Sequence, residues 1–150
     1  MGHNLFPVFD VPATLANRAP NANRYPIAPL WDFEKGDFTT NEAQQVLYGT
    51  GHDAWVLWCV KTILTQRLAH YAYSGNAGIE ADEAFKEPDR RAQESALQRT
   101  VTEALLADPK GRTRQARDFN FSWGVDSLNM SCVVIGANGN SATINASLSI

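Results

Sequence analysis

Charge is scarce in this sequence, and it is absent from the last 24 residues, which follow Asp126. Lys, Arg, Asp and Glu together make up 19% of the 150 residues, whereas ordinary soluble domains have about 25%. The net charge is −3. A nonspecific nucleic-acid binder needs a basic surface to displace counterions from phosphates, so we expect no nucleic-acid partner.

Long apolar runs and cysteines are also scarce. No run approaches the roughly 18 apolar residues that a membrane span needs, and residues 1–10 lack the pattern of a signal peptide. We therefore expect no membrane partner. The two cysteines, Cys59 and Cys132, lie in apolar segments and are expected to be reduced core residues of a protein made in a cytoplasm. With 44% hydrophobic residues, a chain of this length can build one core.

Motifs of catalysis and metal binding are missing as well. The three histidines lie far apart, the cysteines form no CxxC pair, and no phosphate-binding glycine loop or GxSxG elbow is present. We therefore predict no metal, no cofactor and no catalytic residue. Glu80, Asp82 and Glu83 suggest a glycosidase pair, but carboxylates at the start of a helix also favour its positive dipole end.

The first 29 residues differ from the rest of the chain. They hold five of the seven prolines, and proline fixes φ and lacks an amide donor, so this segment is expected to be extended or irregular. A disordered terminus is one interpretation. The segment also carries large apolar side chains, among them Phe6 and Phe9, which a merely solvated tail does not need. We therefore predict an extended partner-binding arm over residues 1–29 and a single α+β domain over residues 30–150.

Local patterns predict a hairpin and two helices at the start of this domain. Residues 30–38 alternate apolar and polar side chains around a turn, which is typical of a hairpin. Thr50, with Asp53 three residues later, is suited to cap a helix that runs to about Tyr71. A second helix is predicted over residues 88–107. The basic residues that follow it are interpreted as a solvated linker: Lys110, Arg112, Arg114 and Arg117.

The last 36 residues alternate apolar and polar side chains in three stretches, which predicts a three-stranded antiparallel meander. The third stretch places Ala142, Ile144, Ala146, Leu148 and Ile150 on its apolar face. The apolar face should cover the helices, and the other face carries Asn, Ser and Thr. The expected fold is therefore α+β: a small helical core packed on a C-terminal three-stranded antiparallel sheet, with an N-terminal hairpin and arm.

The lack of charge in this meander bears on its edges. Soluble proteins normally protect edge strands with lysine, proline or bulges, and neither Lys nor Pro occurs after Asp126. Either the chain itself covers the edge, or a partner strand completes the sheet by β-augmentation. We take Ile144, Asn145 and Leu148, on the last predicted strand, as candidate partner-binding residues.

Several motifs in the middle of the chain resemble a known family. Residues 32–36 (DFEKG), 61–67 (KTILTQR) and 71–80 (YAYSGNAGIE) are similar, in order, to the D-F-x-x-G, I-L-x-T-E-R and Y-x-x-Y-S-x-x-Y-G-x-E motifs of baseplate wedge proteins in contractile phage tails and prophage tail-like particles. These proteins belong to the wider sheath-initiator family. Residues 94–108 and 118–121 resemble its next helix and strand, so the likeness spans about residues 30–136.

The resemblance implies a structural protein of the tail baseplate. Such a subunit lies around the hub, binds wedge proteins and starts sheath assembly, with its sheet completed by an arm of the first sheath subunit. The implied partners are other wedge proteins, the tail sheath protein and hub or tube-initiating proteins, with multiple copies in a six-fold assembly. The implied location is the virion tail baseplate, assembled in the host cytoplasm. The implied contact cluster is Arg67, Tyr71, Tyr73, Gly78 and Glu80.

Two departures and three alternatives remain at this point. Gln66 replaces the glutamate of a family Glu-Arg pair implicated in wedge contacts, and Ala77 replaces an aromatic residue. In one alternative, Arg67 pairs internally with Glu80 while Tyr71 and Tyr73 are core. A second alternative is a tail muramidase that acts through Glu80 and one of the two carboxylates after it. The third is a tail component without a sheath, such as a terminator.

Overall fold

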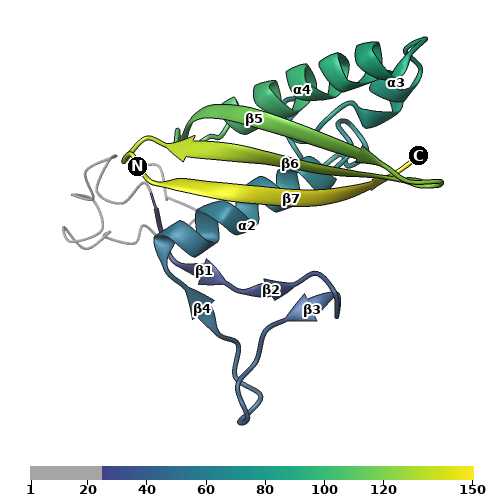
Figure 1. The fold of residues 1–150 in the computed structure, drawn as a ribbon. Helices are drawn as coiled ribbons and strands as arrows, with labels where there is room; N and C mark the ends of the chain where they lie inside the picture. Colours follow the sequence, from purple (N-terminus) through teal and green to yellow (C-terminus); the bar gives the residue numbers. More distant parts are fainter. Residues whose placement is uncertain (1–24) are drawn as a thin grey trace, which may run out of the picture.

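The computed structural model describes residues 25–150, which form a three-stranded sheet with helices packed on one face (Figure 1). The strands, in spatial order, are β5 (Thr113–Trp123), β6 (Ser127–Gly136) and β7 (Ser141–Ser149), all antiparallel. α2 (Gly51–Leu64) packs on the β7 side and α4 (Arg90–Leu106) on the β5 side. This arrangement confirms the predicted α+β fold.

The period-two pattern buries one face of β6 and β7, as predicted. The buried residues of these two strands are Leu128, Met130, Cys132, Val134, Gly136, Ile144, Ala146 and Leu148. Ile150, which the pattern also placed inside, is exposed because it lies beyond the end of β7. The β6–β7 hairpin is confirmed, with a loop over residues 137–140 in which Gly139 adopts a φ of +84°.

The first strand of the sheet starts earlier than its aromatic residues indicate. β5 begins at Thr113, so Arg114 and Arg117 lie on a strand and not in a solvated linker. Its pairing with β6 is interrupted between Thr113 and Gln115 and again between Arg117 and Asn120. Asp118, inside the second interruption, has a φ of 54°, which is uncommon for a residue other than glycine.

α2 begins as the sequence predicts and ends sooner. The Thr50 hydroxyl accepts a hydrogen bond from the Asp53 amide, and the Asp53 carboxylate accepts one from the Thr50 amide, which completes the capping box. The helix stops at Leu64 instead of about Tyr71, because Thr65 turns into extended backbone with φ −97° and ψ 123°. The next residues pair with a distant segment, described below.

The second predicted helix is confirmed as α4, which begins two residues after Pro88. The Asp89 carboxylate caps it by accepting a hydrogen bond from the Ala92 amide at 2.9 Å. Its predicted apolar stripe is buried against the sheet and α2: Leu97, Val101, Ala104 and Leu105. A short helix that the sequence pattern does not single out, α3 (Ala81–Phe85), precedes it and packs beside it.

The N-terminal hairpin extends away from the sheet layer (Figure 1) and has two tiers. β2 (Trp31–Asp32) pairs with β3 (Asp37–Phe38), which confirms the predicted hairpin over residues 30–38. Nearer to α2, β1 (Ala28–Pro29) pairs with β4 (Tyr48–Gly49), so two residues assigned to the arm form a strand. Phe6 and Phe9 lie outside the described residues.

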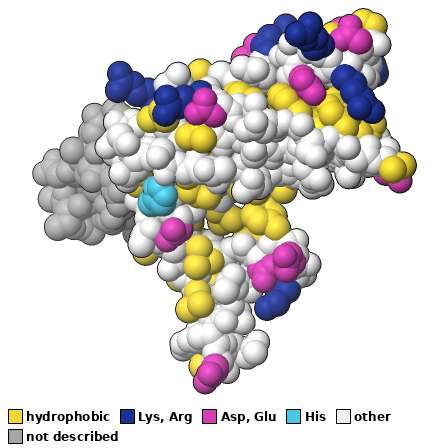
Figure 2. Space-filling view, viewed as in Figure 1, with side chains coloured by type: hydrophobic (Ala, Val, Ile, Leu, Met, Phe, Trp, Pro, Cys, Tyr) yellow, Lys and Arg dark blue, Asp and Glu magenta, His cyan; other side chains and the backbone are white. Residues whose placement is uncertain are grey.

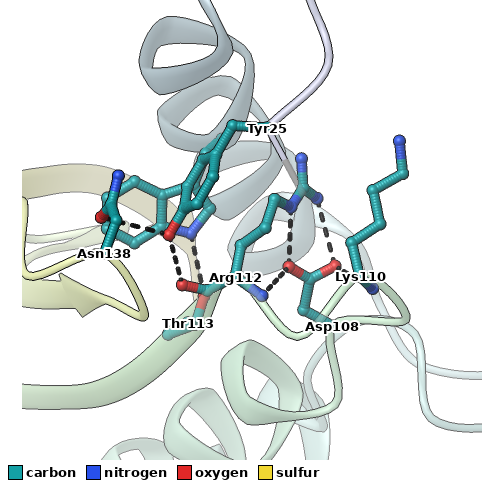
Figure 3. Close-up of polar contacts among 7 residues, drawn as sticks. Tyr25, Asp108, Lys110, Arg112, Thr113 and Asn138 are labelled. Carbon is teal, nitrogen blue, oxygen red and sulfur yellow. Dashed lines mark hydrogen bonds and ion pairs between the residues drawn. The ribbon is translucent and has the colours of Figure 1, made fainter. Parts of the chain in front are cut away.

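A buried polar cluster joins the start of β5 to α2 and to the beginning of the described chain (Figure 3). The Arg112 guanidinium donates two hydrogen bonds to the Asp108 carboxylate, at 2.7 and 3.1 Å, and both side chains are buried. The Tyr25 hydroxyl donates to the Arg112 carbonyl at 2.9 Å, and the Trp55 indole donates to the Thr113 hydroxyl at 2.9 Å. The expectation that Arg112 is solvated is therefore wrong.

The two cysteines lie in the core, as predicted. Both are free and buried, one on α2 and one on β6. Burial raises the pKa of Cys59 to about 12 and that of Cys132 to about 11, so both stay thiols at neutral pH. Among residues 25–150, no helix is long and apolar enough to cross a membrane, and no group of three or more His, Cys, Asp and Glu side chains forms a metal site.

Candidate partner-binding surfaces

The motif residues after α2 form a compact bridge with the segment before α3. Gln66 and Ile79 are partners in a parallel bridge. The Ile79 amide donates to the Thr65 carbonyl at 2.9 Å, and the Arg67 amide donates to the Ile79 carbonyl at 2.8 Å. These two hydrogen bonds close residues 65–79 into a loop whose ends are fixed on the core, because Ile79 itself is buried.

Gly78 is required by the backbone of this bridge. Its φ is +87°, and a Cβ atom there would lie 2.4 Å from the Thr65 carbonyl oxygen. Both observations exclude a larger side chain without movement of the backbone. The motif glycine therefore has a structural role in the folded subunit.

Arg67 uses its polar groups within the protein. Its Nε atom donates to the Gly78 carbonyl at 3.2 Å, and one terminal nitrogen lies 3.1 Å from a Glu80 carboxylate oxygen. The same nitrogen is 4.0 Å from Glu103 Oε2. The Arg67 side chain is 14% exposed, whereas those of Glu80 and Glu103 are 43% and 56% exposed. The internal pairing that the sequence left open as an alternative is thus present.

The two tyrosines of the motif behave differently from that alternative. Tyr71 is fully exposed and Tyr73 is 44% exposed, so neither is a core residue. The Lys61 ammonium lies 5.6 Å from the centre of the Tyr73 ring, and the His70 ring centre is 5.4 Å from it. The structure therefore brings the internal pair and the exposed tyrosines into one loop, with the tyrosines directed to solvent.

The candidate residues on β7 divide between the two faces of the sheet. Ile144 and Leu148 are buried against the helices, and Asn145 is exposed on the outer face. A partner can therefore reach Ile144 and Leu148 through the backbone of β7 and not through their side chains. Among the described residues, β7 has a strand neighbour on one side, β6, and none on the other.

The middle of the outer face of the sheet is polar and uncharged (Figure 2). Two rows of directly paired residues cross it: Asn120, Ser131 and Asn145 in one, and Ser122, Asn129 and Ser147 in the other. These rows line a shallow hollow of about 480 Å³. These two rows offer hydroxyl and amide groups without a charge, which suits a polar protein contact better than a nucleic acid.

The carboxylates considered for catalysis do not form a glycosidase site. Glu80 is engaged with Arg67, and a Glu83 oxygen accepts a hydrogen bond from the exposed Lys86 ammonium at 2.6 Å. The hollow that Glu80 and Glu83 line has a volume of about 100 Å³. Ligand sites usually measure about 300–1,000 Å³, so no observation favours the muramidase alternative.

Sequence reasoning missed a second surface, on the hairpin side of α2. Trp31, Phe33 and Phe38 are partly exposed and line a hollow of about 420 Å³ together with Leu57 and Lys61. The alternation of these aromatic residues indicated a hairpin strand, but two-residue strands bury neither face, so the aromatics remain open. The sequence did contain a signal for this surface: apolar residues alternate on a short strand for which no covering layer was predicted.

Comparison with known proteins identifies the family. The model of the contractile injection system sheath initiator family matches residues 28–139, which cover most of the chain and include the whole span in which the sequence motifs occur. No curated protein matches the chain. A sheath initiator is a structural component of a contractile injection system. This chain belongs to the contractile injection system sheath initiator family.

Proposed function

We propose that this protein is a wedge subunit of a contractile phage tail baseplate that starts sheath assembly by accepting a strand along β7. The observation that carries the proposal is the outer edge of β7, a nine-residue strand without a charged residue that has no strand neighbour on that side among residues 25–150. Its nine pairs with β6 run from Ser127–Ser149 to Ile135–Ser141 without interruption, so its backbone is regular along its whole length. A regular, neutral edge is the kind of strand edge to which a partner strand can add by β-augmentation.

The other edge of the sheet supports the choice of β7. β5 carries Arg114, Arg117 and Asp118, and its register is broken twice. Charged side chains and bulges are the features by which natural sheets prevent strand addition. The contrast between the two edges therefore favours β7 as the one that meets the sheath.

The loop of residues 65–80 makes the contacts with neighbouring wedge proteins. Arg67 and Gly78 hold its ends, while Tyr71 and Tyr73 offer exposed aromatic surface, a residue type enriched at protein interfaces. Glu80 and Glu103 keep exposed carboxylate oxygens that a basic partner can bind. Gln66 lacks the charge of the family glutamate, so the acceptors of this surface are the two glutamates.

In the assembled baseplate, the arm over residues 1–29 contacts neighbouring subunits around the hub, with Phe6 and Phe9 as its apolar anchors. This part of the proposal rests on the sequence of the arm. Tyr25 fixes its C-terminal end to the core through the hydrogen bond to Arg112. Burial of aromatic side chains on a partner offsets the entropy lost when such a segment orders.

The test introduces a lysine at the free edge. Asn145→Lys should block sheath initiation, because a lysine on an edge strand hinders addition of another strand. Asn120→Lys is the matched control, since Asn120 occupies the same cross-strand row on the protected edge. Sheathed particles are counted by electron microscopy after complementation, and thermal unfolding of both variants is compared. Wild-type numbers of sheathed particles from Asn145→Lys would overturn the proposal.

A further inference from the structure

A continuous groove runs along the solvent face of α2. Three hollows, of about 320, 420 and 260 Å³, all have Lys61 in their lining. The first two also share Leu57, and the first and third share Trp58. We call this surface the α2 groove: the exposed side of Leu57, Trp58 and Lys61 with the walls on either side of them.

The walls of the α2 groove are largely apolar. The hairpin wall is formed by Pro29, Trp31, Phe33 and Phe38, and Trp31 packs edge-to-face on Phe38 with ring centres 5.0 Å apart. Hydrophobic side chains are visible where this hairpin meets the rest of the molecule (Figure 2). An exposed apolar surface of this kind is typical of a docking site.

One cation lies in the middle of this apolar surface. Lys61 makes no ion pair with any described residue, and its ammonium contacts the Tyr73 ring at 5.6 Å. Two further cations line the first hollow only: Arg112, which is paired with Asp108, and Lys110. The best occupant of the groove is therefore an apolar segment that carries one carboxylate.

The chain itself contains a segment of this composition. Residues 5–11 read Leu-Phe-Pro-Val-Phe-Asp-Val, with six apolar residues and one acid. Asp10 is the only acidic residue before Asp32. A segment with two phenylalanines matches a groove with an aromatic wall, and its single negative charge matches the single central lysine.

The length of chain between this segment and its anchor fits the same site. The backbone of Tyr25 lies against Gly51, where a Cβ atom would meet the Tyr25 carbonyl oxygen. Lys61 follows ten residues later on the helix, or about 15 Å along its axis. Fifteen residue steps separate Asp10 from Tyr25, and a random-coil chain of that length has a root-mean-square span of about 21 Å. The effective concentration for docking within one chain is highest when the span of the linking segment matches the distance between its anchor and the docking site.

We propose that in the free subunit residues 5–11 occupy the α2 groove of the same chain, with the Asp10 carboxylate paired to Lys61. The segment covers the apolar groove until the subunit assembles, when the arm is released to neighbouring proteins. The inference concerns the isolated subunit and does not depend on strand addition at β7.

The test is a carbodiimide crosslink in the purified full-length protein at low concentration. The reagent joins a carboxylate and an amine in direct contact, with loss of water, and mass spectrometry maps the product. We expect an amide between Asp10 and Lys61 in the monomer band. The three other lysines, Lys35, Lys86 and Lys110, serve as internal controls. Asp10 crosslinked equally to all four, or joined to Lys61 in dimers alone, would overturn the proposal.

A charge exchange and a dye experiment complete the test. The crosslink should disappear in Asp10→Lys and in Lys61→Asp, and it should return when both changes are combined. Replacing Phe6 and Phe9 by serine should increase binding of a hydrophobic dye, while Leu15→Ser, an apolar arm residue outside the segment, should not. Circular dichroism verifies that each variant is folded. Unchanged dye binding with the crosslink absent would show that the groove is open to another partner and would overturn the proposal.

Discussion

Arg112 and Asp108 show how one pair of residues ties the helical layer to the sheet. Asp108 follows α4, Arg112 precedes β5, and the guanidinium also lies 5.1 Å from the ring centre of Trp58 on α2. The carboxylate further accepts hydrogen bonds from the backbone amides of Lys110 and Arg112. Four donors to one buried carboxylate leave its charge well compensated.

Removing the arginine should be costly for that reason. Arg112→Met leaves a buried carboxylate without its counter-charge, and we expect a loss of about 3–5 kcal/mol in the free energy of unfolding. Arg114→Met, two residues later and exposed on β5, should change stability by less than about 0.5 kcal/mol. Urea denaturation followed by tryptophan fluorescence measures both. Equal stability of the two variants would contradict the role assigned to the pair.

The same pair makes stability depend on acid. Burial raises the pKa of Asp108, but the hydrogen bonds from Arg112 and the two backbone amides outweigh it and hold the pKa below its ordinary value. A depressed folded-state pKa means that the unfolded chain binds more protons, so the contribution is present above about pH 4. It is lost as pH falls through the folded-state pKa. Urea midpoints between neutral pH and pH 2 should therefore fall less steeply for Asp108→Asn than for the wild type.

At the scale of elements, the loop of residues 65–80 explains where sequence reasoning succeeded and failed. The capping box at Thr50 is local, and the sequence predicted it. The end of α2 at Leu64 is not local, because Thr65 and Arg67 exchange helical hydrogen bonds for bonds with Ile79. No helix-breaking residue marks the position, so the periodicity predicted a helix seven residues longer. β1 and β4 were missed because two residues are too few to show a period.

Gly78→Ala tests the bridge directly. The alanine Cβ would meet the Thr65 carbonyl oxygen and the backbone would keep a positive φ, so we expect a loss of at least about 2 kcal/mol. Gly111→Ala is the matched control, since its φ is +59° but nothing lies within 4 Å of the added atom. Differential scanning calorimetry should show a larger decrease in Tm for Gly78→Ala. A smaller decrease than in the control would mean that the bridge is not tightly constrained.

At the scale of the whole molecule, composition and alternation were enough to predict the sheet and the core. The roles of the candidate site residues could be assigned only from the three-dimensional structure. The pattern predicted that β7 has a buried face with Ile144 and Leu148. It did not show that Arg67 is occupied internally or that Tyr71 is fully exposed. Those facts depend on which loops meet after folding, and one sequence contains no direct record of such contacts.

The boundary of the arm is a whole-molecule property that truncation can locate. Deleting residues 1–24 should leave the described fold intact and weaken incorporation into baseplates. Deleting Tyr25 as well removes its hydrogen bond to Arg112 and its edge-to-face contact with Trp55, whose ring centre is 5.9 Å away. We expect this one extra residue to cost about 1–3 kcal/mol in chemical denaturation. Unfolding of the shorter deletion would contradict an arm that is separate from the domain.

The unequal edges of the sheet have a consequence for stoichiometry. A sheet with one bulged, charged edge and one regular, neutral edge can be extended from one side only. Under the proposed function, each subunit therefore offers one edge of its own sheet to one incoming strand. A closed ring of such subunits would thus determine the number of sheath chains in the first layer, because each subunit recruits one chain.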